Sequence, residues 1–248
     1  MKDGAPEAGL QALRADLAAA FRLAARFDWH ESVGNHFSVA VSEDGRQFLM
    51  NPKWRHFASI RARDLLLLDA DDPGVMEGPD APDASAWTIH GALHRARPDI
   101  RVVLHCHPPH ATALAGLKLP SLPPIDMNTA RFYGDLAVDL DCGGIADDAT
   151  EGARIASALG SCSTLLMANH GLTCTGATVA QAFEQLYFFE KAARTVLLAR
   201  ASGQDLAVMS DAVARNTAEG WKAYAGMADA HFAHLKSVLD REEPDYCE

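Results

Sequence analysis

Three histidines have the spacing to bind one divalent metal ion together. His105 and His107 lie two residues apart in the apolar run RVVLHCH, so on a strand both imidazoles point to one face and Cys106 points away. His170 ends a second apolar run, TLLMANH, directly before Gly171, where a side chain can reach a neighbouring strand. Three neutral imidazoles suit zinc and leave one coordination position open, and they do not exclude manganese or iron. The sequence therefore predicts a metal site at these three histidines.

The other histidines are weaker candidates for metal ligands. His90 and His94 lie four residues apart on a predicted helix, which also suits a metal, but no glutamate adjoins the first of them as it does in a metalloprotease helix. We interpret both as packing residues. His110, His231 and His234 are interpreted as ordinary surface or packing residues.

Composition narrows the class of protein. The 248 residues include 33 acidic and 22 basic side chains, and the net charge of -11 argues against nucleic acid as a partner. The five cysteines are an odd number without a Cys-x-x-Cys pair, which is typical of reduced thiols in the cytoplasm. No apolar run approaches the ~18 residues of a membrane span, and no signal peptide is evident. We expect a soluble cytoplasmic protein that acts on a small molecule.

Hydrophobic periodicity predicts alternating helices and strands. Helices are predicted at residues 9–27, 85–97, 149–160, 178–201 and 210–240. Strands are predicted at residues 36–42, 46–52, 65–69, 101–107, 164–170 and 172–175. The last seven residues, EEPDYCE, are expected to form a frayed tail.

The order of these elements predicts an α/β domain. Strands that alternate with helices indicate layers, and Asp44-Gly45 between two apolar runs indicates a β-hairpin, so the sheet should be mixed. No linker or internal repeat divides the chain. We therefore expect one domain over residues 1–248.

Two segments resemble the class II aldolase and adducin head family. They read WTIHGALHRARPDIRVVLHCHPPHATAL and, some sixty residues later, LLMANHGLTCTGATVAQAF. The resemblance implies that His105, His107 and His170 bind zinc. It also implies a three-layer α/β/α sandwich around a mixed, largely antiparallel sheet, and a homotetramer with active sites between subunits.

The sequence departs from the aldolases at their catalytic glutamate. In that family a Ser-Ser-Glu motif places the glutamate four residues before a histidine, and the matching position here is Ala86, with Ser85 as the remaining serine. An alanine cannot move a proton, and loss of a positioned acid or base typically removes about 10²–10⁴-fold of rate. The family's Gly-Asn motif survives as Gly34-Asn35, whereas the usual Ser-Gly is replaced within Asn-Pro-Lys-Trp. Lys53, or alternatively Arg55 or Arg61, is then the candidate for an acidic substrate group.

These observations leave three hypotheses for function. The first is a metal-dependent lyase acting on a small hydroxy or keto acid, or on a sugar-acid-like substrate, by retro-aldol cleavage or decarboxylation, and Ala86 favours decarboxylation. Proton transfer would fall to His36, Asp126 or Tyr133, and Asn35, Lys53 and Ser85 are the predicted substrate-binding residues. The second hypothesis is a non-catalytic adducin-like metal-binding module. The third is an iron-dependent oxygenase that uses the same three histidines.

Overall fold

A seven-stranded mixed sheet organises the chain, with the strand order β3-β2-β1-β4-β7-β6-β5. The computed structural model describes residues 7–78, 80–141, 149–224 and 226–248. Neighbouring strands are antiparallel except β5 and β6, which are parallel. The strands are β1 (His36–Ala40), β2 (Gln47–Met50), β3 (Leu66–Asp69), β4 (Val102–Cys106), β5 (Leu136–Asp139), β6 (Thr164–Met167) and β7 (Leu172–Gly176).

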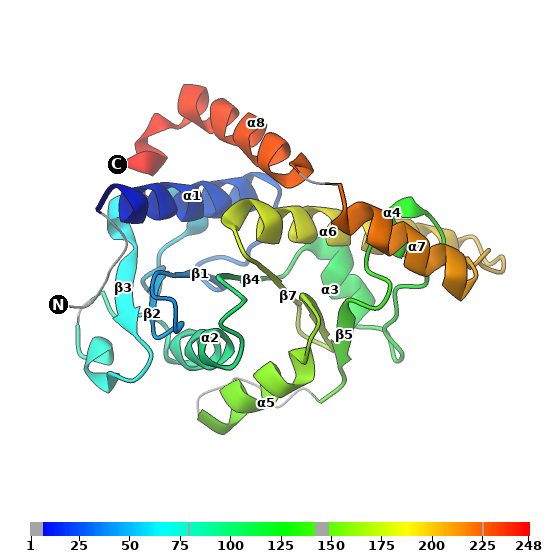
Figure 1. Cartoon of the computed structure of the whole chain (residues 1–248), viewed down its shortest axis with the longest axis horizontal. Helices are drawn as coiled ribbons and strands as arrows, with labels where there is room; N and C mark the ends of the chain where they lie inside the picture. The colour runs from blue at the N-terminus through cyan, green and yellow to red at the C-terminus, as the bar shows by residue number, and fades with distance from the viewer. Residues whose placement is uncertain (1–6, 79, 142–148, 225) are drawn as a thin grey trace.

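Helices cover both faces of the sheet (Figure 1). Helices α1 (Glu7–Arg26) and α6 (Val179–Ala201) lie on one face, and α2 (Ala84–Ala96) and α5 (Ala149–Leu159) lie on the other. The remaining helices are α3 (Pro109–Ala115), α4 (Met127–Ala130), α7 (Asp211–Lys222) and α8 (Met227–Glu242). Helix α8 lies outside α1 and α6, and α7 packs beside α4. The predicted α/β/α sandwich around a largely antiparallel sheet is confirmed.

Strands β1, β4 and β7 present different chemistry on their two faces. Phe37, Leu104 and Cys174 are fully buried in the large core under α1 and α6. Their neighbours in sequence, including His36 and His105, alternate onto the α2 side. Cys106 also joins the core under α1 and α6, so the prediction that it points away from the histidine pair is confirmed.

The predicted strands and most of the helices form close to their expected bounds. At the β1–β2 turn Gly45 has a φ of 70°, and a Cβ there would lie 2.3 Å from the carbonyl oxygen of His94. The hairpin therefore requires glycine for its conformation and for its close approach to α2. None of the described helices is both long and apolar enough to cross a membrane. The four described cysteines are free, and Cys142 lies outside the described residues.

The predicted helical region over residues 210–240 forms as two helices, α7 and α8. Gly226 between them has a φ of 84°, a left-handed conformation that a continuous helix cannot contain. Short elements were missed by periodicity. These are the edge strand β5 and helices α3 and α4, whose four to seven residues are too few to show a period.

The prediction of a frayed C-terminal tail was wrong. Residues Pro244–Cys247 form a 3-10 helix. Tyr246 within it is only 2% exposed, and its hydroxyl donates to Asp240 at 2.7 Å. Burial of this aromatic ring anchors the end of the chain against α1 and α8.

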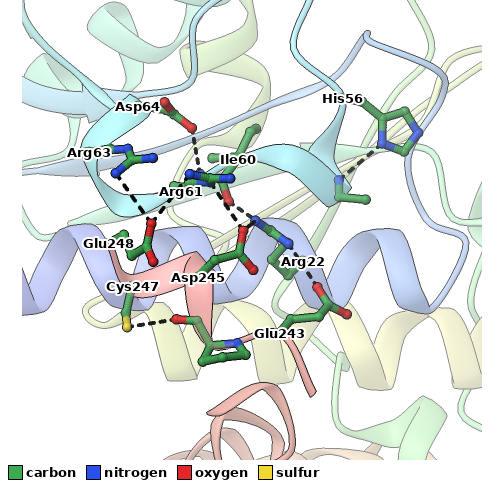
Figure 2. A network of polar contacts seen from close by, with 12 residues as sticks. Arg22, His56, Ile60, Arg61, Arg63, Asp64, Glu243, Asp245, Cys247 and Glu248 are labelled. Carbon is green, nitrogen blue, oxygen red and sulfur yellow. Dashed lines mark hydrogen bonds and ion pairs between the residues drawn. The ribbon is translucent and has the colours of Figure 1, made fainter. Parts of the chain in front are cut away.

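Arg22 of α1 holds the C-terminal segment in place (Figure 2). Its side chain is 6% exposed, and its Nε donates to the carbonyl oxygen of Ile60 at 2.9 Å. Its two terminal nitrogens donate to Glu243 at 3.1 Å and Asp245 at 2.9 Å. One guanidinium thus joins α1, the loop after β2 and the chain end, because its five donors form a planar fork.

Arg22→Ala should lower the free energy of unfolding by about 1–3 kcal/mol. It leaves the carbonyl oxygen of Ile60 without its side-chain donor and removes one of two arginine partners from each of Glu243 and Asp245. Arg63→Ala is the control. Arg63 pairs with Glu248, and both side chains are more than half exposed, so we expect less than about 0.5 kcal/mol. Urea denaturation measures both, and equal effects would contradict this role of Arg22.

The effect of Arg22→Ala should also depend on pH. The hydrogen bond from Arg22 lowers the pKa of Asp245 below its ordinary value. The stabilisation is therefore fully present above the unfolded-state pKa and is lost as pH falls through the lower folded-state pKa. The difference between the wild type and Arg22→Ala should be smaller near about pH 3 than at pH 7.

Candidate metal centre

The fold brings His105, His107 and His170 together at one end of β4. Strand β4 carries His105 and continues to His107, and His170 lies in the turn between β6 and β7. One nitrogen from each imidazole lies within 4.8 Å of the other two, and the ring centroids are 4.8–5.2 Å apart. These separations allow a single ion to contact all three rings.

The β6–β7 turn positions His170 through its backbone. Asn169 has a left-handed φ of 56°, and its N–H donates to the carbonyl oxygen of Ala115 at 3.1 Å. A Cβ at Gly171 would lie 2.3 Å from Cδ2 of His107 and 2.9 Å from the carbonyl oxygen of Cys106. The turn can approach His107 this closely only because residue 171 has no side chain.

Hydrogen bonds orient the rings of His105 and His107. Thr173, directly opposite His105 in the β4–β7 register, donates its hydroxyl hydrogen to Met167 Sδ at 3.7 Å and accepts from His105 Nδ1 at 3.1 Å. His107 Nδ1 donates to the carboxylate of Glu31 at 2.7 Å. With Nδ1 committed as a donor in both rings, each Nε2 of the neutral imidazole is left as a lone pair for a ligand.

The residues present fit a divalent metal ion. Nε2 of His107 is buried and has no hydrogen-bond partner within the described part of the chain, and such an atom costs about 1–3 kcal/mol if nothing binds it. Burial lowers the pKa of His105 well below its ordinary value and also lowers that of His170. Both therefore stay neutral at physiological pH, which is the form that binds zinc.

Glu31 was missed by the sequence analysis. It lies in the loop before β1, and its side chain is 63% exposed. Asn35 Oδ1 accepts from the Glu31 N–H at 2.8 Å, and Asn35 itself has a φ of 68°. Asn35 thus holds the loop that carries Glu31, and its predicted contact with substrate stays a prediction. No spacing pattern identifies Glu31, because the contact depends on this loop conformation.

His36 lies beside the three histidines without being one of them. It is directly opposite His105 in the β1–β4 register, and the two rings stack with centroids 4.8 Å apart. Burial lowers the pKa of His36 to about 4. His90 on α2 contacts its Nδ1 at 2.7 Å. His90 and His94 are fully buried and are not in the group that could hold a metal.

The position of the family's glutamate is apolar in this protein. Ala86 is 1% exposed and packs in a cluster with Phe48, Met50, Leu68 and Ala70. An ionised carboxylate placed among these side chains would lose its hydration. Alanine in place of the aldolase glutamate therefore suits the apolar packing of α2 against β2 and β3.

Asp83 is a further carboxylate that the sequence analysis missed. It caps the N-terminus of α2 by accepting from the N–H groups of Ser85 and Ala86, and the Ser85 hydroxyl donates to it at 2.5 Å. Its negative charge opposes the lowering of the pKa of His36 by burial. The predicted substrate role of Ser85 stays a prediction, since its hydroxyl is engaged with Asp83.

The other predicted residues have their described contacts elsewhere. Asp126 caps α4 by accepting from Thr129, and Tyr133 hydrogen-bonds Asp211 on α7, which raises the pKa of Tyr133. Lys53 lies half-buried after β2. Within one chain, Asp126 contacts α4 and Tyr133 contacts α7. The catalytic roles predicted for Asp126 and Tyr133 and the substrate-binding role predicted for Lys53 stay predictions. Of the alternative cations, Arg55 forms an ion pair with Asp64. Arg61 forms ion pairs with Asp245 and Glu248.

Comparison with known proteins identifies the family. The model of the class II aldolase and adducin N-terminal domain matches residues 15–197. The chain belongs to this family. A crystal structure of an aldolase II superfamily protein from Pseudomonas syringae is 31% identical and superposes with a TM-score of 0.85, covering 96% of each chain.

Two named enzymes are also similar to this class II aldolase family member. L-fuculose 1-phosphate aldolase from Glaciozyma antarctica is 26% identical, with a TM-score of 0.83, and the match covers 99% of this chain and 96% of that one. Decarboxylase NovR from Streptomyces niveus is 30% identical over 83% of this chain and 78% of its own length. The family thus includes enzymes named for two different carbon–carbon bond cleavages.

Glu31→Ala should weaken zinc binding by about 10- to 100-fold, because loss of a partner that orients a metal-binding histidine typically has this effect. The control is Glu43→Ala, which removes an exposed carboxylate in the β1–β2 turn and should leave zinc affinity unchanged. Calorimetric titration of the metal-free protein with zinc measures both. An unchanged affinity in Glu31→Ala would show that the contact with His107 has no role in orienting the ring.

Gly171→Ala should abolish tight zinc binding while the chain still folds, because the added Cβ would displace the His107 ring. Gly220→Ala on α7 is the matched control, since a Cβ there meets no atom within 4 Å. Zinc titration and thermal unfolding report the two effects separately. Wild-type affinity in Gly171→Ala would contradict the assignment of His107 as a ligand.

Proposed function

We propose that this protein is a divalent-metal-dependent lyase that cleaves a carbon–carbon bond in a small hydroxy or keto acid. The observation that carries the proposal is the group of three imidazoles, two of which have Nδ1 bound to a protein acceptor. Zinc is the metal this donor set suits best, and three ligands leave a position for substrate. Homotetramer assembly and a cytoplasmic location are part of the same proposal, by likeness to the family.

Decarboxylation is the cleavage we favour. The apolar surroundings of Ala86 leave no acid or base where the aldolases have one, and loss of CO₂ does not require removal of a hydroxyl proton. The similarity to a protein named as a decarboxylase supports the same choice. Retro-aldol cleavage would need another group to take the hydroxyl proton.

In this proposal each residue of the candidate site has a defined role. A bound zinc ion supplies Lewis-acid stabilisation of the negative charge that develops on substrate oxygen. Glu31 and Thr173 keep the ligand rings oriented, and His36 handles the proton beside them. Lys53 would attract an acidic substrate group as a point charge. Asn35 and Ser85 would border the substrate, and Asp126 and Tyr133 would act only if the assembly places them at a neighbouring subunit's site.

The test combines metal analysis with product detection. The full chain, purified without added metal, should contain about one zinc per chain and should release CO₂ from at least one member of a panel of hydroxy and keto acids. His107→Ala should lose the metal and at least about 10²-fold of the rate. His234→Ala, which changes an exposed histidine of α8, should lose neither.

Other outcomes would overturn the proposal. Folded protein that holds no metal would rule out the lyase. Metal-loaded protein that releases neither CO₂ nor aldehyde from the panel would indicate a non-catalytic adducin-like metal-binding module. Release of an aldehyde without CO₂ would indicate retro-aldol cleavage, and oxygen consumption with bound iron would indicate an oxygenase.

A further inference from the structure

A continuous chain of buried polar groups leads away from His36 through the α2 side of the sheet. His36 Nδ1 lies 2.7 Å from His90 Nε2. His90 Nδ1 lies 2.5 Å from the Ser38 hydroxyl, which lies 2.7 Å from His94 Nε2. The chain ends where His94 Nδ1 meets the carbonyl oxygen of Ile100 at 3.2 Å. Ser38, His90 and His94 are all 0% exposed, so water does not compete for these bonds.

The carbonyl at the end of this chain determines the direction of every bond. A backbone carbonyl can only accept, so Nδ1 of His94 carries the hydrogen. Burial lowers the pKa of His94 to about 4, which keeps the ring neutral and leaves its Nε2 as an acceptor. Ser38 has one hydroxyl hydrogen, and it must be donated to that Nε2. The Ser38 oxygen can then only accept.

The fixed bond directions extend through His90 to His36. Because the Ser38 oxygen accepts, Nδ1 of His90 carries a hydrogen. Burial lowers the pKa of His90 well below its ordinary value, so His90 is neutral and its Nε2 accepts from His36 Nδ1. We infer that His94, Ser38 and His90 form a tautomer relay that holds His36 with its hydrogen on Nδ1 and leaves Nε2 as a bare acceptor beside the three histidines.

The inferred tautomer defines what His36 can do, and this consequence rests on the proposed function. A bare Nε2 receives a hydrogen bond from a substrate hydroxyl or a water molecule, and it disfavours a carboxylate oxygen at the same place. In the favoured decarboxylation, His36 would first accept a proton from water, breaking a water O–H bond and forming an Nε2–H bond. It would then donate that proton to the carbon from which CO₂ departs, and the hydroxide left from water would combine with CO₂ as bicarbonate. His90, Ser38 and His94 are positioning residues, because they act through His36.

Nitrogen NMR tests the tautomer directly. Long-range proton–nitrogen spectra of the ¹⁵N-histidine-labelled full chain, freed of metal with EDTA and held at pH 7, report which ring nitrogen carries hydrogen. Signals are assigned by their loss in His36→Asn and His90→Asn. We expect a protonated Nδ1 and a bare Nε2 for His36, His90 and His94. A protonated Nε2 on His36 in the wild type would overturn the relay, whether or not any lyase activity is found.

Ser38→Ala tests whether the relay is connected. Without the hydroxyl, His90 loses its acceptor, and both His90 and His36 should shift toward the Nε2-protonated form while His94 keeps hydrogen on Nδ1. Thr175→Val is the matched control, because it removes a buried hydroxyl that donates to the carbonyl oxygen of Ser163 on the same face of the sheet but outside the relay. It should leave the His36 signals unchanged. An unchanged His36 spectrum in folded Ser38→Ala would refute the relay, and if that variant does not fold, the wild-type spectrum decides.

Discussion

The need of every buried imidazole for hydrogen-bond partners organises the α2 side of the sheet. An unpaired polar atom in a protein interior costs about 1–3 kcal/mol, and this side contains His90 and His94 at 0% exposure and His105 at 6%. Their partners come from residues with a fixed strand register, such as Thr173 opposite His105. The packing of α2 against the sheet therefore depends on the same hydrogen bonds that orient the imidazoles.

Among the described imidazoles, two buried nitrogens lack a hydrogen-bond partner: Nδ1 of His30 and, where the three histidines converge, Nε2 of His107. Nδ1 of His107 is bound to Glu31, yet its Nε2 remains buried without a partner. A ligand that takes up that lone pair would bind the native state and not the unfolded chain, so it would stabilise the fold. The Arg22 contacts join α1, on the opposite side of the sheet from α2, to the segment after α8, and they hold the chain end without involving the imidazoles.

Period-two alternation explains which features could be predicted from sequence. It placed His105 and His107 on one face and Cys106 on the other, and a hairpin at Gly45 followed from its turn chemistry. Glu31 could not be predicted, because its contact depends on a loop with left-handed residues. The buried tail around Tyr246 was missed for a similar reason, since its anchor on Arg22 is more than two hundred residues away in sequence. Asp83 was missed because the helix was predicted to begin at residue 85, one residue later than α2 begins, so Asp83 was not placed at its N-cap.

X-ray absorption at the zinc edge of the metal-loaded protein tests the central claim most directly. We expect nitrogen and oxygen neighbours at about 2.0–2.1 Å from zinc, with the outer-shell scattering of three imidazoles and at most one oxygen ligand besides them. Sulfur scatterers near about 2.3 Å, or a first shell of oxygens without imidazole scattering, would contradict the assignment of His105, His107 and His170 as the metal ligands.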